Sequence, residues 1–482
     1  MDYKPTKRKS AFTIILVIVF LALALTITFV IGFQAGRFAG SSSNQPSGLD
    51  SRFSLFESVY NIMNKDFYFG DDSEEYKDKL VYDAINGMVD SQGDIHTDYM
   101  TPEEVREFTG SLESNIVGVG IRYRELDGEI FVLEVLRDSP AERAGLQAGD
   151  IVTAVDGVTC KENSVEYVAK LVAGERGTDV VLTINRMGKL MDITATRDIV
   201  GTTVSSTVKD GIGVLTITSF GDKTAEEMAK HLNYLKQENV TRLIIDLRNN
   251  GGGYAQTLDE MCTYFMDNGQ IVMIEEDRDG NQIIDKVRKS RKIKYDKIII
   301  LVNDNSASCS EVFTLALKEN CNAIIVGTTT YGKGLAQLST VFSDGSALKY
   351  TDVIWKSGNG VFINGEGITP DYTVRLHDAL YLNYLNLDDG EVYQYDQVSS
   401  KVYTAQVMLD FLGYSVDRQD GYFSEATRDA ITAFQKNNGL EVNGLLDKRT
   451  ASAIDSKVVS EWGIHKDKYD TQMHKALELA KQ

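Results

Sequence analysis

Hydrophobic residues change their spacing several times along the chain, and each change predicts a different kind of element. The first is an uncharged run over residues 11–33, rich in Ile, Leu, Val and Phe. This run is long enough to cross a bilayer, whereas a cleavable signal core usually needs only about 7–15 apolar residues. Four basic residues precede it, so the positive-inside rule predicts a cytoplasmic tail (1–10), a single transmembrane anchor (11–33) and an extracytoplasmic remainder. The alternatives are a signal peptide cut within 34–40 and a buried helix.

Beyond a linker over residues 34–50, the spacing becomes helical, then β, and then alternates between the two. In residues 51–113 apolar residues recur at three and four positions, which predicts a helical region. Short β-branched runs broken by Gly and Asp predict a β-rich module over 114–198. In residues 199–398 strand signals alternate with helix signals, which favours a layered core. The predicted fold class is therefore α/β and multidomain.

Residues 399–456 contain an internal repeat with an offset of 23 residues. Residues 420–427 (DGYFSEAT) and 443–450 (NGLLDKRT) each place a turn, Asp-Gly or Asn-Gly, before a candidate helix N-cap, Ser424 or Asp447. This pattern predicts a small unit that is separate from the layered core. The last segment, 457–482, ends in an amphipathic pattern and is predicted as a C-terminal helix.

Charge and composition exclude several function classes. The chain has 50 Lys+Arg and 70 Asp+Glu, so 50 − 70 gives a net charge of −20. A strongly acidic chain makes a poor nucleic-acid binder, because contact with phosphates needs a basic surface. The five histidines are scattered without metal-site spacing, and four cysteines are too few for a disulfide scaffold. We therefore expect no metal and no other cofactor.

Two of the three patterns that contain a lysine fit known motifs incompletely. Residues 327–334 (GTTTYGKG) look like a phosphate-binding loop, but Gly stands where that motif needs Ser or Thr for Mg²⁺. Residues 346–349 (SALK) and 356–358 (KSG) look like elements of the penicillin-recognising enzymes. There the two elements belong to distant parts of a large domain, whereas here they are only seven residues apart.

The third pattern is Ser306–Glu311 (SASCSE) before a predicted helix, followed by Lys333 and, four residues later, Gln337. Amides at a helix N-terminus can stabilise an oxyanion, and burial can lower the pKa of a lysine until the amine is neutral enough to act as a base. A neutral amide such as Gln337 could orient this lysine without adding negative charge. The alternative is that the serines only cap the helix and that Lys333 lies at the surface.

These residues resemble the C-terminal processing peptidases, also called tail-specific proteases. SASCSE matches the family's serine motif, and Gly332–Gly334 with Gln337 matches its lysine motif. Three further motifs occur in the expected order, at 94–99 (DIHTDY), 246–253 (DLRNNGGG) and 367–371 (GITPD). The resemblance covers residues 51–385 and the final helix. It implies a serine endopeptidase with a crotonase-like layered core.

The resemblance also implies a role for each residue of these motifs. Ser308 would be the nucleophile, Lys333 its general base and Gln337 the residue that orients the base. The oxyanion would meet the amide of Cys309 and one from the turn at Gly251 and Gly252. Gly251 stands where the family usually has proline, which predicts a less rigid turn.

Residues 114–198 resemble a PDZ module through VGVGI at 117–121 and SPAERAGL at 139–146. Such a domain adds a peptide as an extra strand and holds its terminal carboxylate on loop amides. The alternative is an interaction domain unrelated to proteolysis. The expected substrate-binding residues are Val117, Gly118, Val119, Gly120 and Ile121.

Residues 399–456 are similar to small three-helix peptidoglycan-binding domains. The expected partners are therefore protein substrates with exposed C-terminal tails, the cell membrane and bacterial peptidoglycan, with no nucleic acid. The helical ends, 51–90 and 470–482, are plausible surfaces for a homodimer. Two alternatives from other classes are a catalytically silent scaffold, built from PDZ and wall-binding modules, and a cell-wall-modifying enzyme.

Overall fold

The computed structural model describes residues 51–112, 117–126, 129–136, 139–147, 149–186, 189–200 and 203–482. The predicted tail, anchor and linker (1–50) lie outside these ranges. Within them, no helix combines the length and the apolar character that a membrane crossing requires. The chain divides into two compact units, one ending at Met88 and one spanning Val89–Gln482.

The described part of the first unit is helical, as the spacing of its apolar residues predicts. It contains α2 (Ser51–Lys65) and most of α3 (Glu74–Asp90), whose last two residues belong to the second unit. Many large apolar side chains are exposed here, among them Leu55 at 69% and Phe69 at 79%.

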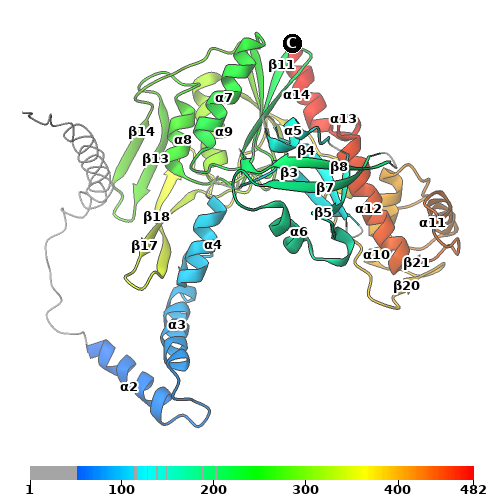
Figure 1. Cartoon of the computed structure of the whole chain (residues 1–482). Helices are drawn as coiled ribbons and strands as arrows, with labels where there is room; N and C mark the ends of the chain where they lie inside the picture. The colour runs from blue at the N-terminus through cyan, green and yellow to red at the C-terminus, as the bar shows by residue number, and fades with distance from the viewer. Residues whose placement is uncertain are drawn as a thin grey trace, which may run out of the picture. The chain divides into compact units, whose positions relative to one another are not determined.

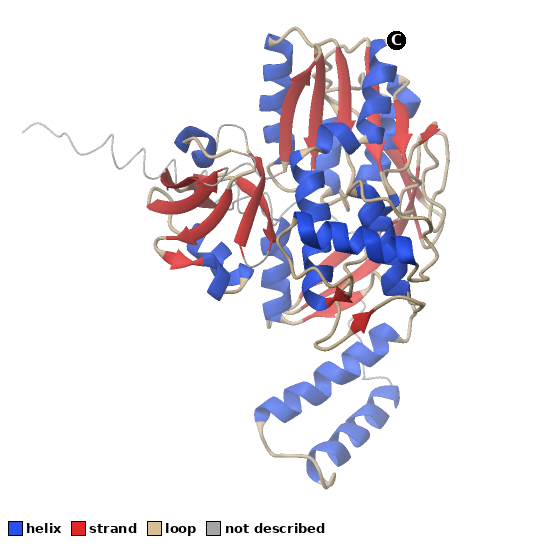
Figure 2. Ribbon diagram, turned by 90° about the vertical axis from the view of Figure 1, so that its right-hand side faces the viewer, coloured by secondary structure: helices blue, strands red, loops and turns tan. Residues whose placement is uncertain are grey.

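A six-stranded sheet forms the centre of the second unit (Figures 1 and 2). Its first strand is antiparallel to its neighbour and the others are parallel. In spatial order the strands are β10 (Val204–Lys209), β11 (Ile212–Ile217), β12 (Arg242–Asp246), β15 (Lys297–Val302), β16 (Ile324–Gly327) and β19 (Tyr372–Thr373).

Helices cover both faces of this sheet (Figure 2). On one face, Leu243 and Ile245 of β12 pack in one cluster with residues of α7 (Thr224–Gln237), α8 (Ala255–Cys262) and α9 (Cys309–Cys321). On the other face, Ile244 packs with the apolar side of α14 (Thr471–Lys481). Because successive strand residues point to opposite faces, burial on both sides explains why these strands are continuously apolar.

A second, antiparallel sheet brings distant motifs of the sequence together. β1, which ends the DIHTDY motif, pairs with β18, and β18 pairs with β17, which carries Gln337. α4 (Pro102–Leu112) follows β1. The strands are β1 (Asp98–Met100), β18 (Ala347–Lys356), β17 (Leu335–Val341), β13 (Ile271–Asp277) and β14 (Gln282–Lys286).

The predicted β-rich module has its own apolar core, with Val132 and Leu182 at its centre. Its main sheet consists of β3 (Ile121–Leu126), β4 (Glu129–Val135), β5 (Ile151–Val155), β7 (Asp179–Arg186) and β8 (Lys189–Thr196), with β6 (Val158–Thr159) paired to β5. β2 (Val117–Gly118) pairs with β9 (Asp198–Ile199). The helical segments are α5 (Pro140–Ala144), η1 (Cys160–Glu162) and α6 (Val165–Val172).

The small unit predicted at 399–456 contains three helices around a separate core. Ser424 and Asp447 are N-caps, which confirms their prediction. Its elements are α10 (Ser400–Phe411), α11 (Glu425–Asn437), α12 (Lys448–Ile464) and the short pair β20 (Val392–Tyr393) and β21 (Leu446–Asp447), preceded by η2 (Asp378–Leu380). α12 continues past residue 456, and α13 (Lys466–Tyr469) separates it from α14, so the C-terminal segment contains more than one helix.

The internal repeat has a structural cause. The side-chain oxygen of buried Gln406 accepts the amide of Gly421, and its nitrogen donates to Thr427 Oγ1 at 2.9 Å. Gln435 repeats this with Gly444 and Thr450, which lie 23 residues further along the chain. Each glutamine therefore holds one turn against the helix that follows it.

Candidate active site

The three serines of the SASCSE motif have different environments. The hydroxyl of Ser306 donates to the carbonyl of Leu247 at 2.8 Å, and that of Ser310 donates to the carbonyl of Asn250 at 2.8 Å. Both of these serines are fully buried, whereas Ser308 is half-buried. Ser308 is therefore the serine of this motif that remains accessible to a ligand.

Ser308 is held in an unusual backbone conformation. It follows β15 and caps α9 with φ 55° and ψ −121°. A positive φ is uncommon for a residue with a side chain and persists only where the surroundings enforce it. Such strained positions cluster at functional sites. Here the strained residue is a serine at the N-terminus of a helix.

A buried carboxylate, Glu311, connects the serine segment with the lysine segment. Its Oε2 accepts the amide of Ser308 at 2.9 Å and the amide of Lys333 at 2.9 Å. Its Oε1 accepts the amide of Gly332 at 2.8 Å and the hydroxyl of Thr330 at 2.5 Å. Four donors thus satisfy a carboxylate that is 0% exposed. Hydrogen bonds to an ionised acceptor are stronger than neutral ones, so this residue fixes the two segments relative to each other.

The glycines beside Lys333 are needed for close packing. Gly332 has φ +85°, and a Cβ on it would lie 2.7 Å from the amide nitrogen of Gly367 in the GITPD motif. A Cβ on Gly334 would lie 2.8 Å from Cβ of Asn364. The backbone around Lys333 is further held by Trp355, whose Nε1 donates to the Lys333 carbonyl at 2.9 Å.

The charge state of Lys333 is shifted towards the neutral amine. Burial lowers the pKa of Lys333, and the positive charge of Lys349 lowers it further, against the opposing effects of Cys309, Asp94 and Glu311. The amine makes no hydrogen bond or ion pair within the described ranges. A lysine with a lowered pKa and a free amine can act as a general base.

Ser308 and Lys333 both act on the thiol of Cys309. Burial raises the pKa of this thiol to about 11, while the Ser308 hydroxyl and the Lys333 charge oppose the rise. No hydrogen bond joins the Ser308 and Lys333 side chains to each other in the part of the chain that the structure describes. The thiol itself donates to the carbonyl of Gly253 at 3.2 Å, so Cys309 stays protonated and packs as a small residue.

Gln337 has a partner other than Lys333. Its Nε2 donates to Thr351 Oγ1 at 3.3 Å, and among the described residues no hydrogen bond joins it to the lysine. Thr351 in turn donates to Asp94, the first residue of the DIHTDY motif, at 2.6 Å. His96 of the same motif is half-buried, and burial together with the Lys333 charge lowers its pKa.

The glycine-rich turn lies directly against the serine. A Cβ on Gly252 would lie 2.8 Å from Cβ of Ser308 and 3.0 Å from the amide nitrogen of Cys309. The Gly252 amide donates to Asn250 Oδ1 at 2.9 Å. The amides of Gly251 and Cys309 donate to no acceptor within the described residues.

The predicted peptide-binding loop is well ordered by backbone bonds. The carbonyl of Val119 accepts the Ala141 amide at 2.7 Å. Gly120 has φ +82°, and a Cβ on it would lie 2.4 Å from Cβ of Ser139. Val117 and Gly118 form β2, Val119 is buried, and half-buried Ile121 starts β3.

The serines of the competing SALK and KSG patterns are not accessible. Ser346 is 2% exposed, accepts the Tyr99 hydroxyl at 2.9 Å and donates to Asp344 at 2.7 Å. Ser357 is 1% exposed. Neither can reach a substrate in this conformation, and the two elements belong to one antiparallel strand and its end.

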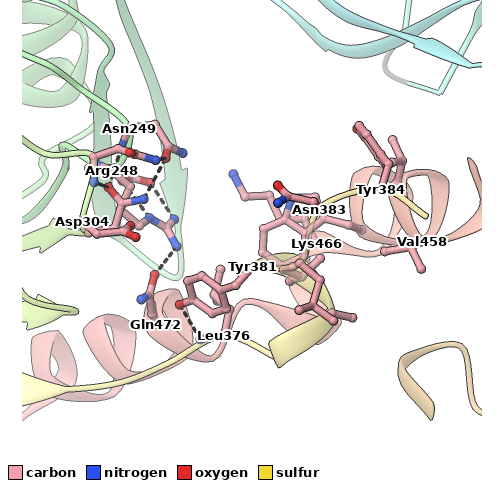
Figure 3. A pocket seen from close by; sticks show the side chains of 18 of the residues that line it. Arg248, Asn249, Asp304, Leu376, Tyr381, Asn383, Tyr384, Val458, Lys466 and Gln472 are labelled. Carbon is pink, nitrogen blue, oxygen red and sulfur yellow. Dashed lines mark hydrogen bonds and ion pairs between the residues drawn. The ribbon is translucent and has the colours of Figure 1, made fainter. Parts of the chain in front are cut away.

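A cavity of about 750 Å³ lies at the carboxyl ends of β11, β12 and β15 (Figure 3). Arg248 on one side bonds to Asp246 at 2.7 Å, to Asp470 at 2.8 Å and to Gln472 at 3.0 Å. Residues of the three-helix unit and its flanks, including Tyr384, lie opposite. The bonds from Arg248 to Asp470 and Gln472 tie the C-terminal segment to the DLRNNGGG motif, which contains the glycine-rich turn.

Sequence reasoning assigned no role to several residues that organise this site. Glu311, Thr330 and Thr351 hold the other groups through hydrogen bonds, but no pattern along the chain predicted this role for them. For Glu311 a signal existed, because an acidic residue three positions after a helix N-cap is typical of a capping box.

Comparisons with known proteins agree on one family. Residues 211–374 match peptidase family S41, residues 131–186 a PDZ domain and residues 398–454 a putative peptidoglycan binding domain. A probable CtpA-like serine protease of Staphylococcus epidermidis is 36% identical over 425 residues, covering 87% of this chain and 85% of that protein. A probable CtpA-like serine protease of Staphylococcus aureus is 32% identical over 466 residues, covering 96% and 92%. The structure of a photosystem II D1 C-terminal processing protease is 27% identical, with a TM-score of 0.41, covering 68% and 87%.

Proposed function

The chain belongs to peptidase family S41 as a CtpA-like serine protease, and from this premise we propose that it cleaves proteins with unstructured C-terminal tails through a Ser308–Lys333 dyad. The observation that carries the proposal is the shared oxygen of Glu311, which receives the backbone amides of both residues at 2.9 Å. The segment that carries Ser308 and the loop that carries Lys333 are thereby held together, with an accessible serine in the first and a free amine in the second.

The proposed reaction has two halves. The neutral Lys333 amine takes the proton of the Ser308 hydroxyl, and Oγ forms a bond to the carbonyl carbon of the peptide. The amide of Cys309 and an amide of the turn at Gly251 and Gly252 stabilise the oxyanion. Lys333 then gives its proton to the leaving amine, and an acyl-enzyme remains. Water, activated by the same lysine, releases the acyl group and restores Ser308.

The other parts of the chain would bring the substrate to this site. We propose that the PDZ domain binds the tail as an added strand, with its carboxylate on the loop Gly118–Gly120. Residues 11–33 would anchor the protein as a single pass, with the catalytic part outside the membrane. The domain at 398–454 would bind peptidoglycan, and the helical ends would pair in a homodimer. No cofactor is needed for this chemistry.

The test uses the full chain in detergent and a folded protein that carries a disordered apolar tail. Ser308→Ala and Lys333→Ala should each abolish tail cleavage, whereas Ser346→Ala should keep it, because Ser346 is buried and cannot reach a substrate. Cleavage should persist in EDTA. Proteolysis that survives in Ser308→Ala would contradict the proposal, and a wild-type chain without activity would favour the scaffold.

Peptidoglycan binding needs a separate experiment. The full chain should sediment with purified, protein-free sacculi, and Ser308→Ala should sediment equally, because the serine lies outside the three-helix domain. A chain that stays in the supernatant would remove the wall from the list of partners without affecting the protease assignment.

A further inference from the structure

A series of hydrogen bonds leads from the DIHTDY motif to Gln337. Asp94 Oδ2 accepts the hydroxyls of Thr97 and Thr351, each at 2.6 Å, and Oδ1 accepts the His96 amide at 3.0 Å. Thr351 Oγ1 then accepts Nε2 of Gln337 at 3.3 Å. Its backbone amide donates to Thr97 Oγ1 at 3.2 Å, so Thr351 is held at two points.

The charge of Asp94 sets the direction of every bond in this series. Burial would raise the pKa of Asp94, but the hydrogen bonds from Thr351, Thr97 and the His96 amide lower it below its ordinary value. Asp94 is therefore ionised at neutral pH and can only accept hydrogen bonds. The single hydroxyl proton of Thr351 must point to Asp94, so the oxygen of Thr351 can only accept from Gln337.

The orientation of the Gln337 carboxamide follows from this. A carboxamide has two donors at one end and an acceptor at the other. Because the Thr351 oxygen can only accept a hydrogen bond, Gln337 turns its NH₂ group towards Thr351 and its carbonyl oxygen away from it. The opposite orientation would place two acceptors against each other.

An irregularity in the sheet makes this pairing possible. The register between β17 and β18 runs Leu335 to Ile354 and Ala336 to Val353, and then shifts so that Gln337 faces Thr351. Without the shift, Gln337 would face Asp352. Residues directly opposite each other in an antiparallel pair have neighbouring side chains, and bulges re-aim a side chain next to active sites. The bulge thus replaces a carboxylate by a neutral hydroxyl.

We propose that Asp94 and Thr351 are positioning residues that fix the Gln337 carboxamide, so that its carbonyl oxygen accepts an N–H of Lys333 while the lysine lone pair faces Ser308. This inference rests on the proposed role of Lys333 as the base. The Gln337–Lys333 contact forms on substrate binding, since catalytic hydrogen bonds often tighten only in the complex. The neutral hydroxyl of Thr351 links Asp94 to Gln337, so Asp94 can orient the Gln337 carboxamide without a direct bond between its carboxylate and the Lys333 amine.

The experiment measures kcat and KM of the full chain on the tail-bearing protein. Thr351→Val should lower kcat by about 10–100-fold with KM unchanged, because a misplaced catalytic group costs up to about 100-fold. Thr351→Ser keeps the hydroxyl and should recover most of that loss. Thr340→Val, on the exposed part of the same strand as Gln337, is the matched control and should behave as wild type.

A double-mutant cycle decides whether Thr351 acts through Gln337. If it does, Thr351→Val should add almost nothing to the loss in Gln337→Met, since residues of one network are not additive. Asp94→Asn is the second variant and keeps the volume of the side chain. Its NH₂ group would donate to Thr351 and reverse the series, which should lower kcat and, by removing a negative charge near Lys333, move the acid limb of the pH profile to lower pH.

Three results would overturn the inference: an unchanged kcat in Thr351→Val, equal losses in Thr351→Val and Thr351→Ser, or additive losses in the cycle. None of these affects the proposed function, which fails if Ser308→Ala or Lys333→Ala stays active, or if the wild-type chain is inactive, in the same assay.

Discussion

Glu311 accepts the backbone amide of Lys333 at 2.9 Å on the same oxygen that accepts the amide of Ser308. The acceptor is a fully buried carboxylate on the helix that Ser308 caps, and the donor lies in a loop 22 residues further on. The two proposed catalytic residues are therefore positioned through their main chains, which leaves both side chains free for chemistry.

The first prediction concerns this carboxylate. Glu311→Gln replaces one acceptor oxygen by an NH₂ group, which faces backbone donors and leaves them unpaired. We expect a loss of at least about 2 kcal/mol in the free energy of unfolding. We also expect kcat to fall about 10–100-fold, because Ser308 and Lys333 separate. Urea unfolding and kcat are the measurements. Glu319→Gln, on the same helix but partly exposed, is the control, and an equal effect there would contradict the prediction.

The second prediction concerns the close contact at Gly252. Gly252→Ala would push a methyl group to 2.8 Å from Cβ of Ser308 and 3.0 Å from the Cys309 amide. We expect kcat/KM to fall by about 100-fold or more, as when an oxyanion donor is lost. Gly280→Ala is the matched control, because Gly280 also has a positive φ, +82°, but has nothing within 4 Å of its Cβ position. Equal losses in both variants would show that backbone strain alone is responsible.

The third prediction concerns pH. In the proposed mechanism the neutral form of Lys333 is the active one, so kcat/KM should rise with pH through the pKa of Lys333 and then level off. Burial and Lys349 lower this pKa, while Cys309, Asp94 and Glu311 raise it. Lys349→Met removes a positive charge, so the pKa of Lys333 should rise and the acid limb should move to higher pH.

The control for this pH experiment is Lys356→Met on the same strand. Lys356 pairs with Glu276 at 2.9 Å and is not among the charges that shift the pKa of Lys333, so the profile of Lys356→Met should match wild type. An acid limb whose position on the pH axis does not change in Lys349→Met would contradict the prediction. A limb that moves to lower pH would show that Lys349 acts on the site by another route.

The fourth prediction concerns the ion pair between Arg248 and Asp470, the N-cap of α14. Asp470 is 2% exposed and bonds to Arg248, whose side chain is 8% exposed. Asp470→Asn removes one charge from a buried network and should cost about 3 kcal/mol of unfolding free energy. Asp467→Asn removes the partner of Lys209 at the surface and should cost at most about 1 kcal/mol. Chemical denaturation of both variants provides the comparison.

The elements that follow from local spacing could be predicted from the sequence. The continuously apolar strands, the helix caps Ser424 and Asp447 and the repeat at an offset of 23 residues can each be recognised from residue types within a few positions of one another. The cause of the repeat could not be predicted, because Gln406 lies 15 residues before Gly421 and Gln435 only nine before Gly444. The spacing between the two glutamines along the chain therefore differs from the spacing of 23 residues between the two turns.

The site was predicted as a set of residues but not as an arrangement. SASCSE offers three serines at equal spacing, and only the packing of Ser306 and Ser310 against carbonyls about 60 residues upstream leaves Ser308 accessible. The proposed dyad also requires a lowered pKa of Lys333, and the first cause of that shift is burial, which exists only in the folded chain.

The sequence by itself determined the order of the elements, the family motifs and the residue types available for chemistry, because these depend on periodicity and on contacts over a few residues. The tertiary structure alone decided that Glu311 joins Ser308 to Lys333 and that a bulge sets Gln337 against Thr351. Register and burial depend on strands and loops brought together from distant parts of the chain, and no local pattern encodes which of them will meet.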